Sequence, residues 1–137
     1  MVVFPTEEWV GAWVALVNSS PDFRSAGVGW VGSACLIVTN PPVPGDAPFY
    51  LRLTGQDGHW SDFRVARQPH GSGDRLTLAA PYDVWRKVIR QELGPLRGIV
   101  QGDLRVKGHL PDLLKYRASV VVMCELAGRL DTRFLDD

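Results

Sequence analysis

The sequence predicts a two-layer α+β domain in which helices cover one face of a five-stranded, mostly antiparallel sheet. Four of the five candidate strands alternate apolar and polar residues, which is typical of strands with one dry face. The candidate helices at 5–20 and 81–93 each carry an apolar stripe. Because an alternating sheet buries only one face, we expect all helices to pack on that same face.

The first half of the chain begins with two helices. "PTEEWVGAWVALVNSS" (5–20) has Thr6 as N-cap and an apolar stripe, and "SPDFRSAG" (20–27) has Ser20 as N-cap and Gly27 as its end. A β-rich run at 28–40 then ends in the Pro-rich loop 41–48. Further alternation predicts strands at 49–55, 59–68 and 75–80, with Gly-containing turns between them.

The second half adds a helix at 81–93, a short helical turn at 94–102 and a last helix at 111–128. Between them, "GIVQGDLRVKGHL" (98–110) alternates strictly and predicts the fifth strand. Its dry face touches either an ordinary packed core or a cavity that holds something apolar. The apolar parity consists of Val100, Gly102, Leu104, Val106 and Leu110, and the polar parity of Gln101, Asp103, Arg105, Lys107 and His109.

Length and charge narrow the functional classes. A chain of 137 residues fits a single domain, which we place at 1–137. Fifteen basic and fifteen acidic residues cancel, so neither nucleic acid nor an anionic membrane surface is an expected partner. The start of the chain lacks the basic and apolar regions of a signal peptide, and the longest apolar run, Val120 to Cys124, is too short to span a bilayer. We therefore expect a cytoplasmic protein without an integral membrane segment.

No residue pattern indicates catalysis or a metal site. Cys35 and Cys124 lie in separate apolar runs, which favours buried, reduced thiols. The three histidines, His59, His70 and His109, lie at turns or strand ends without metal-ligand spacing. Ser72 in "PHGSGDR" matches neither a nucleophile elbow nor a phosphate loop, because position 70 is His and no Lys follows. We expect no catalytic residue, no metal and no cofactor.

The last helix is apolar around more than one face. From Ala118 to Cys124 nearly the whole circumference is uncharged, whereas a helix lying on a sheet needs only one apolar face. A second partner is therefore required, and another helix, another subunit or a bound lipid would each serve.

The segment "DRLTLAAPYDVWRKVIRQELGPLRGIVQGDLRVKGHLPDLLKY" (74–116) resembles the sterol carrier protein 2 family, the sterol-binding domain. The matching positions are Leu76 and Leu78, Trp85, Leu93 to Pro95, and then Gly102, Leu104 and Gly108. The order of elements before residue 74 is also similar. The sequence departs from the family in the Pro-rich loop 41–48 and in its five tryptophans.

The resemblance implies a hydrophobic tunnel between sheet and helices that binds fatty acid, acyl-CoA, sterol or other lipid without catalysis. Leu104 and Val106 would face this tunnel, with Gln101 near its wall. An alternative is an accessory subunit of an enzyme with a hydrophobic substrate, in which the last helix contacts the enzyme or forms a homodimer. The residues expected to bind ligand are Trp85, Ile89, Leu96, Ile99, Val100, Gln101, Leu104, Val106, Leu113, Tyr116, Val120 and Met123.

Overall fold

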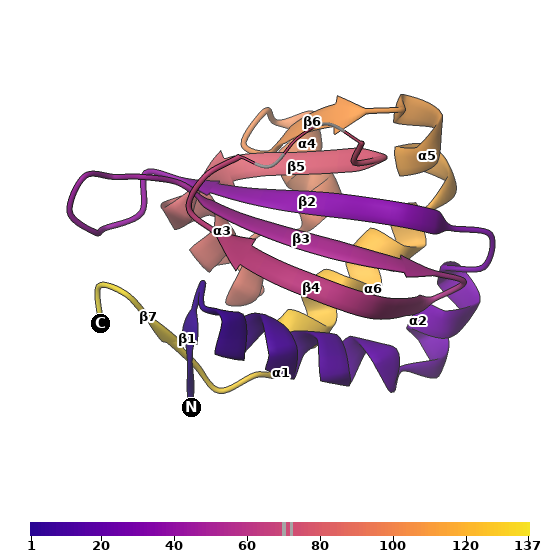
Figure 1. Ribbon diagram of the computed structural model, residues 1–137, viewed down its shortest axis with the longest axis horizontal. Helices are drawn as coiled ribbons and strands as arrows, with labels where there is room; N and C mark the ends of the chain where they lie inside the picture. Colours follow the sequence, from indigo (N-terminus) through magenta and orange to yellow (C-terminus); the bar gives the residue numbers. More distant parts are fainter. Residues whose placement is uncertain (70, 72) are drawn as a thin grey trace.

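The part of the chain that the structure describes, residues 1–69, 71 and 73–137 of a computed structural model, forms a five-stranded sheet with helices on one side (Figure 1). The helices are α1 (Glu7–Asn18), α2 (Pro21–Ala26), α3 (Tyr82–Ile89), α4 (Pro95–Val100), α5 (Leu110–Lys115) and α6 (Arg117–Ala127). The strands are β1 (Val2–Phe4), β2 (Val31–Thr39), β3 (Phe49–Gln56), β4 (His59–Ala66), β5 (Leu76–Pro81), β6 (Arg105–Gly108) and β7 (Thr132–Phe134).

The sheet has the strand order β4-β3-β2-β5-β6, in which β2 and β5 are parallel and the other neighbours are antiparallel. The predicted α+β class with a mostly antiparallel sheet is confirmed. Directly paired residues share a face of the sheet, so one apolar row crosses all five strands. The row consists of Val65, Leu51, Leu36, Leu78 and Val106.

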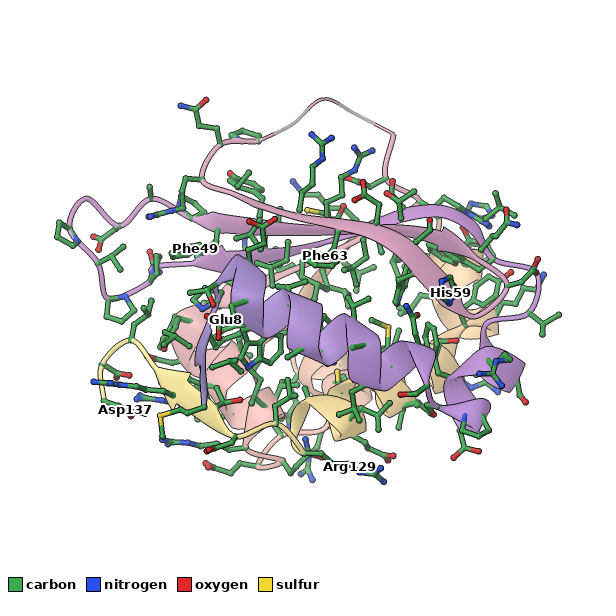
Figure 2. The ribbon with its side chains drawn as sticks, turned by 60° about the horizontal axis from the view of Figure 1, so that its bottom comes forward. Glu8, Phe49, His59, Phe63, Arg129 and Asp137 are labelled. Carbon is green, nitrogen blue, oxygen red and sulfur yellow. The ribbon has the colours of Figure 1, made fainter. Side chains whose placement is uncertain are left out.

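The helix starts follow the predicted caps. The hydroxyl oxygen of Thr6 accepts a hydrogen bond from the backbone N–H of Trp9 at 3.2 Å. The hydroxyl oxygen of Ser20 accepts one from the backbone N–H of Phe23, also at 3.2 Å. Helix α1 then runs along β4, as Figure 2 shows with α1 in front of the sheet. A β-carbon built on Gly11 would lie 3.2 Å from the Phe63 ring, so the glycine lets α1 approach the strand closely.

Helix α6 lies at the centre of the helical layer and contacts each of the other five helices of the described chain. Two of its carbonyl oxygens accept side-chain donors from its neighbours. The indole N–H of Trp13 in α1 donates to the carbonyl of Met123 at 2.9 Å, and the Gln91 amide donates to the carbonyl of Cys124 at 2.9 Å. The second partner that an apolar circumference requires is therefore the set of neighbouring helices.

Two predicted elements had wrong boundaries, and one strand pair was missed. The last helix breaks at Tyr116, which has φ −105° and ψ 19° and packs its ring edge-on against Trp30, with centroids 5.1 Å apart. The fifth strand spans only Arg105–Gly108, because the preceding residues complete α4 and the chain then turns at Gly102, where φ is 83°. The parallel pair β1–β7 was not predicted, since each strand has only three residues.

The turn between β3 and β4 is pressed against α2. Gly58 has φ 74°, and a β-carbon there would lie 2.6 Å from the backbone of Arg24. Gly45 has a similar φ of 83° in the loop before β3, but no atom lies within 4 Å of the corresponding position. Contact with α2 therefore requires glycine at position 58 for space as well as for backbone conformation.

We expect Gly58→Ala to destabilise the fold by about 2 kcal/mol more than Gly45→Ala, because both variants share the left-handed backbone strain and only the first adds the clash. Urea denaturation of the two variants beside the parent measures the difference. Equal losses would show that α2 does not pack against this turn.

Candidate ligand cavity

A cavity of about 90 Å³ lies between the inner face of the sheet and the helices. The sheet contributes the leucines and valines of its inner face, and α1, α3 and α6 contribute the opposite wall. All five tryptophans of the chain line it. The principal lining residues are Trp9, Trp13, Trp30, Leu36, Val38, Leu51, Leu53, Trp60, Leu76, Leu78, Trp85, Leu104, Tyr116, Ser119, Val120 and Met123.

No aspartate, glutamate, lysine or arginine is among the lining residues that the structure describes. A buried ionised group needs a partner, because transfer of a charge out of water is costly. The cavity therefore suits an apolar molecule, whose burial gains free energy in proportion to the area removed from water.

Four of the five indole N–H groups have hydrogen-bond partners, and three of these bonds link distant parts of the chain. Each bond satisfies a donor that would otherwise be buried without an acceptor. The pairs are Trp9 with the Thr132 hydroxyl, Trp13 with the Met123 carbonyl, Trp30 with the Gly32 carbonyl and Trp85 with the Ile37 carbonyl, at 2.9, 2.9, 3.0 and 2.9 Å.

The structure brings half of the predicted ligand residues to this cavity. The set consists of Trp85, Ile89, Leu104, Tyr116, Val120 and Met123. Leu113 is buried, and Ile99 and Val106 are partly buried against the core without lining the cavity. Leu96 lines a second hollow described below.

Val100 and Gln101 lie on the surface, contrary to their predicted place at the ligand. Val100 is 87% exposed and Gln101 is also exposed. Both positions are exposed because the fifth strand starts later than predicted. Val100 is the last residue of α4 and Gln101 is its C-cap, so the alternation of a strand does not apply to either residue. The resemblance that assigned Gln101 to the tunnel wall does not transfer to this position.

The wall contributed by the first half of the chain was missed. Trp9, Trp13, Trp30 and Trp60 line the cavity, as do Leu51 and Leu53 of β3. The signal was present, because the stripe of the first helix and the parity of the strands already placed most of these side chains on the dry side. The predicted ligand residues instead all lie at position 85 or beyond, in the second half of the chain.

A second hollow of about 220 Å³ lies between α3, α4 and α6. It shares Val88, Pro95 and Cys124 with the first cavity, so these three residues stand between the two spaces. Gln91, Arg97 and Glu125 also line it, which gives this hollow the polar groups that the first one lacks. The hollow therefore offers a place where a ligand could meet water.

The described histidines are dispersed. His59 begins β4 at its exposed end, as Figure 2 shows, and His109 is exposed and precedes α5. His70 and Ser72 lie outside the described residues. Within the described residues, no three His, Cys, Asp or Glu side chains come together as a metal site. Nor does any helix there have the length and apolar character to cross a membrane.

Neither a protein-family model nor a curated protein sequence matches the chain. A crystal structure of sterol carrier protein 2 superposes with a TM-score of 0.82 at 24% identity, covering 91% of this chain and 97% of that one. A conserved hypothetical protein from Thermus thermophilus, suggested to be a sterol carrier protein, gives a TM-score of 0.80 at 23% identity, with 93% and 90% covered. The chain has the sterol carrier protein 2 fold.

A domain of the sterol carrier protein from Helicoverpa armigera is a more distant example, with a TM-score of 0.57 at 16% identity over 93% of this chain and 91% of that one. The resemblance seen in the sequence is thus confirmed for the fold. In this chain, the cavity lies between the sheet and the helical layer of that fold.

Both cysteines are free thiols at this cavity. Burial raises the pKa of Cys35 to about 12, with a further increase from the charge of Asp74 and an opposing effect of Arg52. Burial also raises the pKa of Cys124 to about 12, with a smaller contribution from Glu125. Only the thiolate is a strong nucleophile, so both side chains are inert packing groups near neutral pH.

We expect both thiols of the native protein to react with an aromatic disulfide reagent at pH 8 roughly a thousandfold more slowly than an ordinary cysteine, because raising the pKa by about three lowers the thiolate fraction by that factor. The unfolded thiols lose their protons from about pH 9 upward while the folded ones keep them, so stability should also fall above pH 9. Reaction of the two cysteines in guanidinium is the control. A fast reaction in the native protein would contradict the burial.

Proposed function

We propose that the chain binds and carries a hydrophobic ligand, such as a fatty acid, acyl-CoA, sterol or other lipid, in the cavity between sheet and helices. The observation that carries this proposal is a cavity lined mostly by apolar and aromatic side chains, with no aspartate, glutamate, lysine or arginine among the described lining residues. Such a surface favours apolar molecules of many shapes, because it offers few hydrogen bonds by which to distinguish them.

The ligand would extend from the first cavity into the second. The first cavity, at about 90 Å³, is the smaller of the two, so a long chain would continue past Val88, Pro95 and Cys124 into the second. A charged end group would then lie near Gln91, Arg97 and Glu125, in contact with water. This path between α3, α4 and α6 is our proposal for the tunnel that the family resemblance implies.

We expect the affinity for straight-chain ligands to rise about fourfold per added methylene and then to level off where the chain leaves the cavity, since each buried methylene contributes about 0.8 kcal/mol. Tryptophan emission should report each titration, because five indoles line the wall. Unchanged emission together with no heat in calorimetry, for every chain length, would refute lipid binding.

Filling the cavity should oppose binding. Met123 is partly exposed and lines the cavity from α6. We expect Met123→Trp to lower ligand affinity tenfold or more, while the free energy of unfolding changes by less than about 1 kcal/mol, because the larger ring enters empty space.

The control is Leu114→Trp on α5, where the native side chain is 64% exposed; it should alter neither quantity. If Met123 were instead in close-packed surroundings, overpacking would cost about 1–3 kcal/mol. A destabilised Met123→Trp protein that binds lipid normally would contradict the position of α6 in the binding wall.

A contact surface for an enzyme partner is the second candidate. Leu110 and Leu114 of α5 are 61% and 64% exposed, and Leu114 belongs to the last helix of the sequence prediction, 111–128, which was the expected contact surface. Native mass spectrometry of freshly purified protein separates the candidates. A co-purified lipid mass supports the carrier, whereas an empty protein that forms a stable dimer or enzyme complex supports the contact surface.

A further inference from the structure

The protein exposes large aliphatic side chains mainly at one end. Of the large hydrophobic side chains that are exposed in the described chain, most belong to α5 or to the segment that leads into β2. They are Val28, Val31, Leu110 and Leu114. Figure 1 shows α5 and the start of β2 at the same end of the sheet, opposite both chain termini. Exposed apolar side chains that gather in one place mark interaction sites, whereas single scattered ones need no explanation.

Arg75 holds the two segments side by side. Its guanidinium donates to the Asp112 carboxylate of α5 at 2.7 and 3.2 Å and to the Val31 carbonyl at 3.1 Å. A β-carbon built on Gly29 would lie 3.7 Å from the Lys115 ammonium nitrogen, so the loop before β2 also lies against α5. The exposed aliphatic side chains are therefore carried by elements that are fixed to one another.

The segment from β6 to the start of α6, residues 105–117, is strongly basic. Its only carboxylate, Asp112, is already neutralised by Arg75. Arg117 donates to the Leu114 carbonyl, which places a positive charge directly beside an exposed leucine. The exposed cations of the segment, none of which has an ion-pair partner among the described residues, are Arg105, Lys107, Lys115 and Arg117.

The neutral total charge of the chain conceals this local excess. Fifteen acidic and fifteen basic residues cancel over the whole sequence, which argued against an anionic membrane surface as a partner. Association depends, however, on the charge of the surface that makes contact rather than on the sum. The carboxylates of Glu8 and Asp137 lie at the other end of the molecule, near the chain termini (Figures 1 and 2).

Exposed aliphatic side chains beside unpaired cations fit a membrane that contains anionic lipids. The cations attract the anionic headgroups, and leucine or valine side chains gain free energy by entering the boundary between headgroups and acyl chains. A protein partner matches this surface less well, because tryptophan and tyrosine dominate the energetics of protein interfaces whereas leucine and valine contribute seldom. The aromatic residues next to α5, Trp30 and Tyr116, are both buried.

We infer that Val28, Val31, α5 and the flanking cations of 105–117 form a docking surface for a membrane that contains anionic lipids. The inference extends the proposed function, because a carrier must meet a membrane to take up or release its lipid. Tyr116, at which α5 ends, is one of the residues that line the cavity, so the docking surface adjoins the cavity wall.

Binding of the purified protein to vesicles tests the inference. The probes are vesicles of phosphatidylcholine alone and vesicles in which about 30% of the lipid is phosphatidylglycerol, which is anionic. We expect co-sedimentation to show at least about tenfold tighter binding to the anionic vesicles at low salt. This preference should largely disappear at about 0.5 M NaCl, because salt screens exposed charges.

Charge reversal on the surface should abolish the preference. We expect Lys107→Glu combined with Lys115→Glu to weaken binding to anionic vesicles about tenfold or more, since attraction is replaced by repulsion. The matched control is Lys87→Glu combined with Arg129→Glu, which changes the net charge equally at exposed positions in α3 and after α6. The control pair should weaken binding less than threefold.

The aliphatic contribution is tested by Leu110→Ser combined with Leu114→Ser. We expect this variant to bind the anionic vesicles about tenfold more weakly, because the apolar contact is lost while every charge remains. Its melting temperature should equal that of the parent, since both side chains are exposed in the folded protein.

The outcomes separate docking from ligand binding. Equal binding to both kinds of vesicle, binding to neither, or an equal loss in the control pair would overturn the docking surface, and the carrier function would stand if the parent still binds alkyl ligands in solution. The charge-reversed protein should keep the parent's affinity for these ligands. A protein that ignores vesicles yet forms a stable complex with an enzyme would overturn the membrane as the partner and assign the surface to the second candidate function.

Discussion

The structure depends on hydrogen bonds that hold helix α6 to helix α1 and to the segment after α3 rather than to the sheet. The Met123 carbonyl accepts the Trp13 indole, and the Cys124 carbonyl accepts the Gln91 amide, each at 2.9 Å. Gln91 adopts φ 64°, a conformation that is uncommon outside glycine, in the position from which its side chain reaches α6. Because these bonds fix α6 to its neighbours in the helical layer, the helix keeps its position although its inner face borders the cavity.

The tryptophans combine two roles in this arrangement. Each buries a large apolar ring at the cavity wall, and three of the five, Trp9, Trp13 and Trp85, use their N–H group to link elements that lie far apart in sequence. Trp60 differs, because its N–H has no partner. The same side chains thus frame a cavity whose surface is almost entirely apolar. Such walls suit a carrier that distinguishes its ligands weakly, because they offer few hydrogen bonds.

Much of the fold could be predicted because periodicity reports burial directly. The parity of the strands placed Leu51, Leu53, Leu76 and Leu78 on the inner face, and the caps located the first two helices. The break at Tyr116 could not be found this way, because it depends on the contact of the Tyr116 ring with Trp30, far away in sequence. The pair β1–β7 is likewise a contact between the two ends of the chain, which no local pattern contains.

The candidate site was predictable only in part. Residues on α3 and α6 were found from helical spacing, whereas Val100 and Gln101 were misplaced because the alternation at 98–110 continues through a helix end and a turn. The surface around α5 could not be inferred at all, because only the folded chain brings Val31 beside the basic segment 105–117.

The central claim is that an apolar chain enters the cavity lined by the tryptophans. Titration with an alkyl ligand that carries bromine in the middle of its chain tests this most directly, because bromine quenches indole fluorescence only on contact. The account predicts strong quenching that saturates near equimolar ligand and disappears when the protein is unfolded in guanidinium. Weak quenching that rises linearly with ligand concentration, equally in folded and unfolded protein, would contradict it.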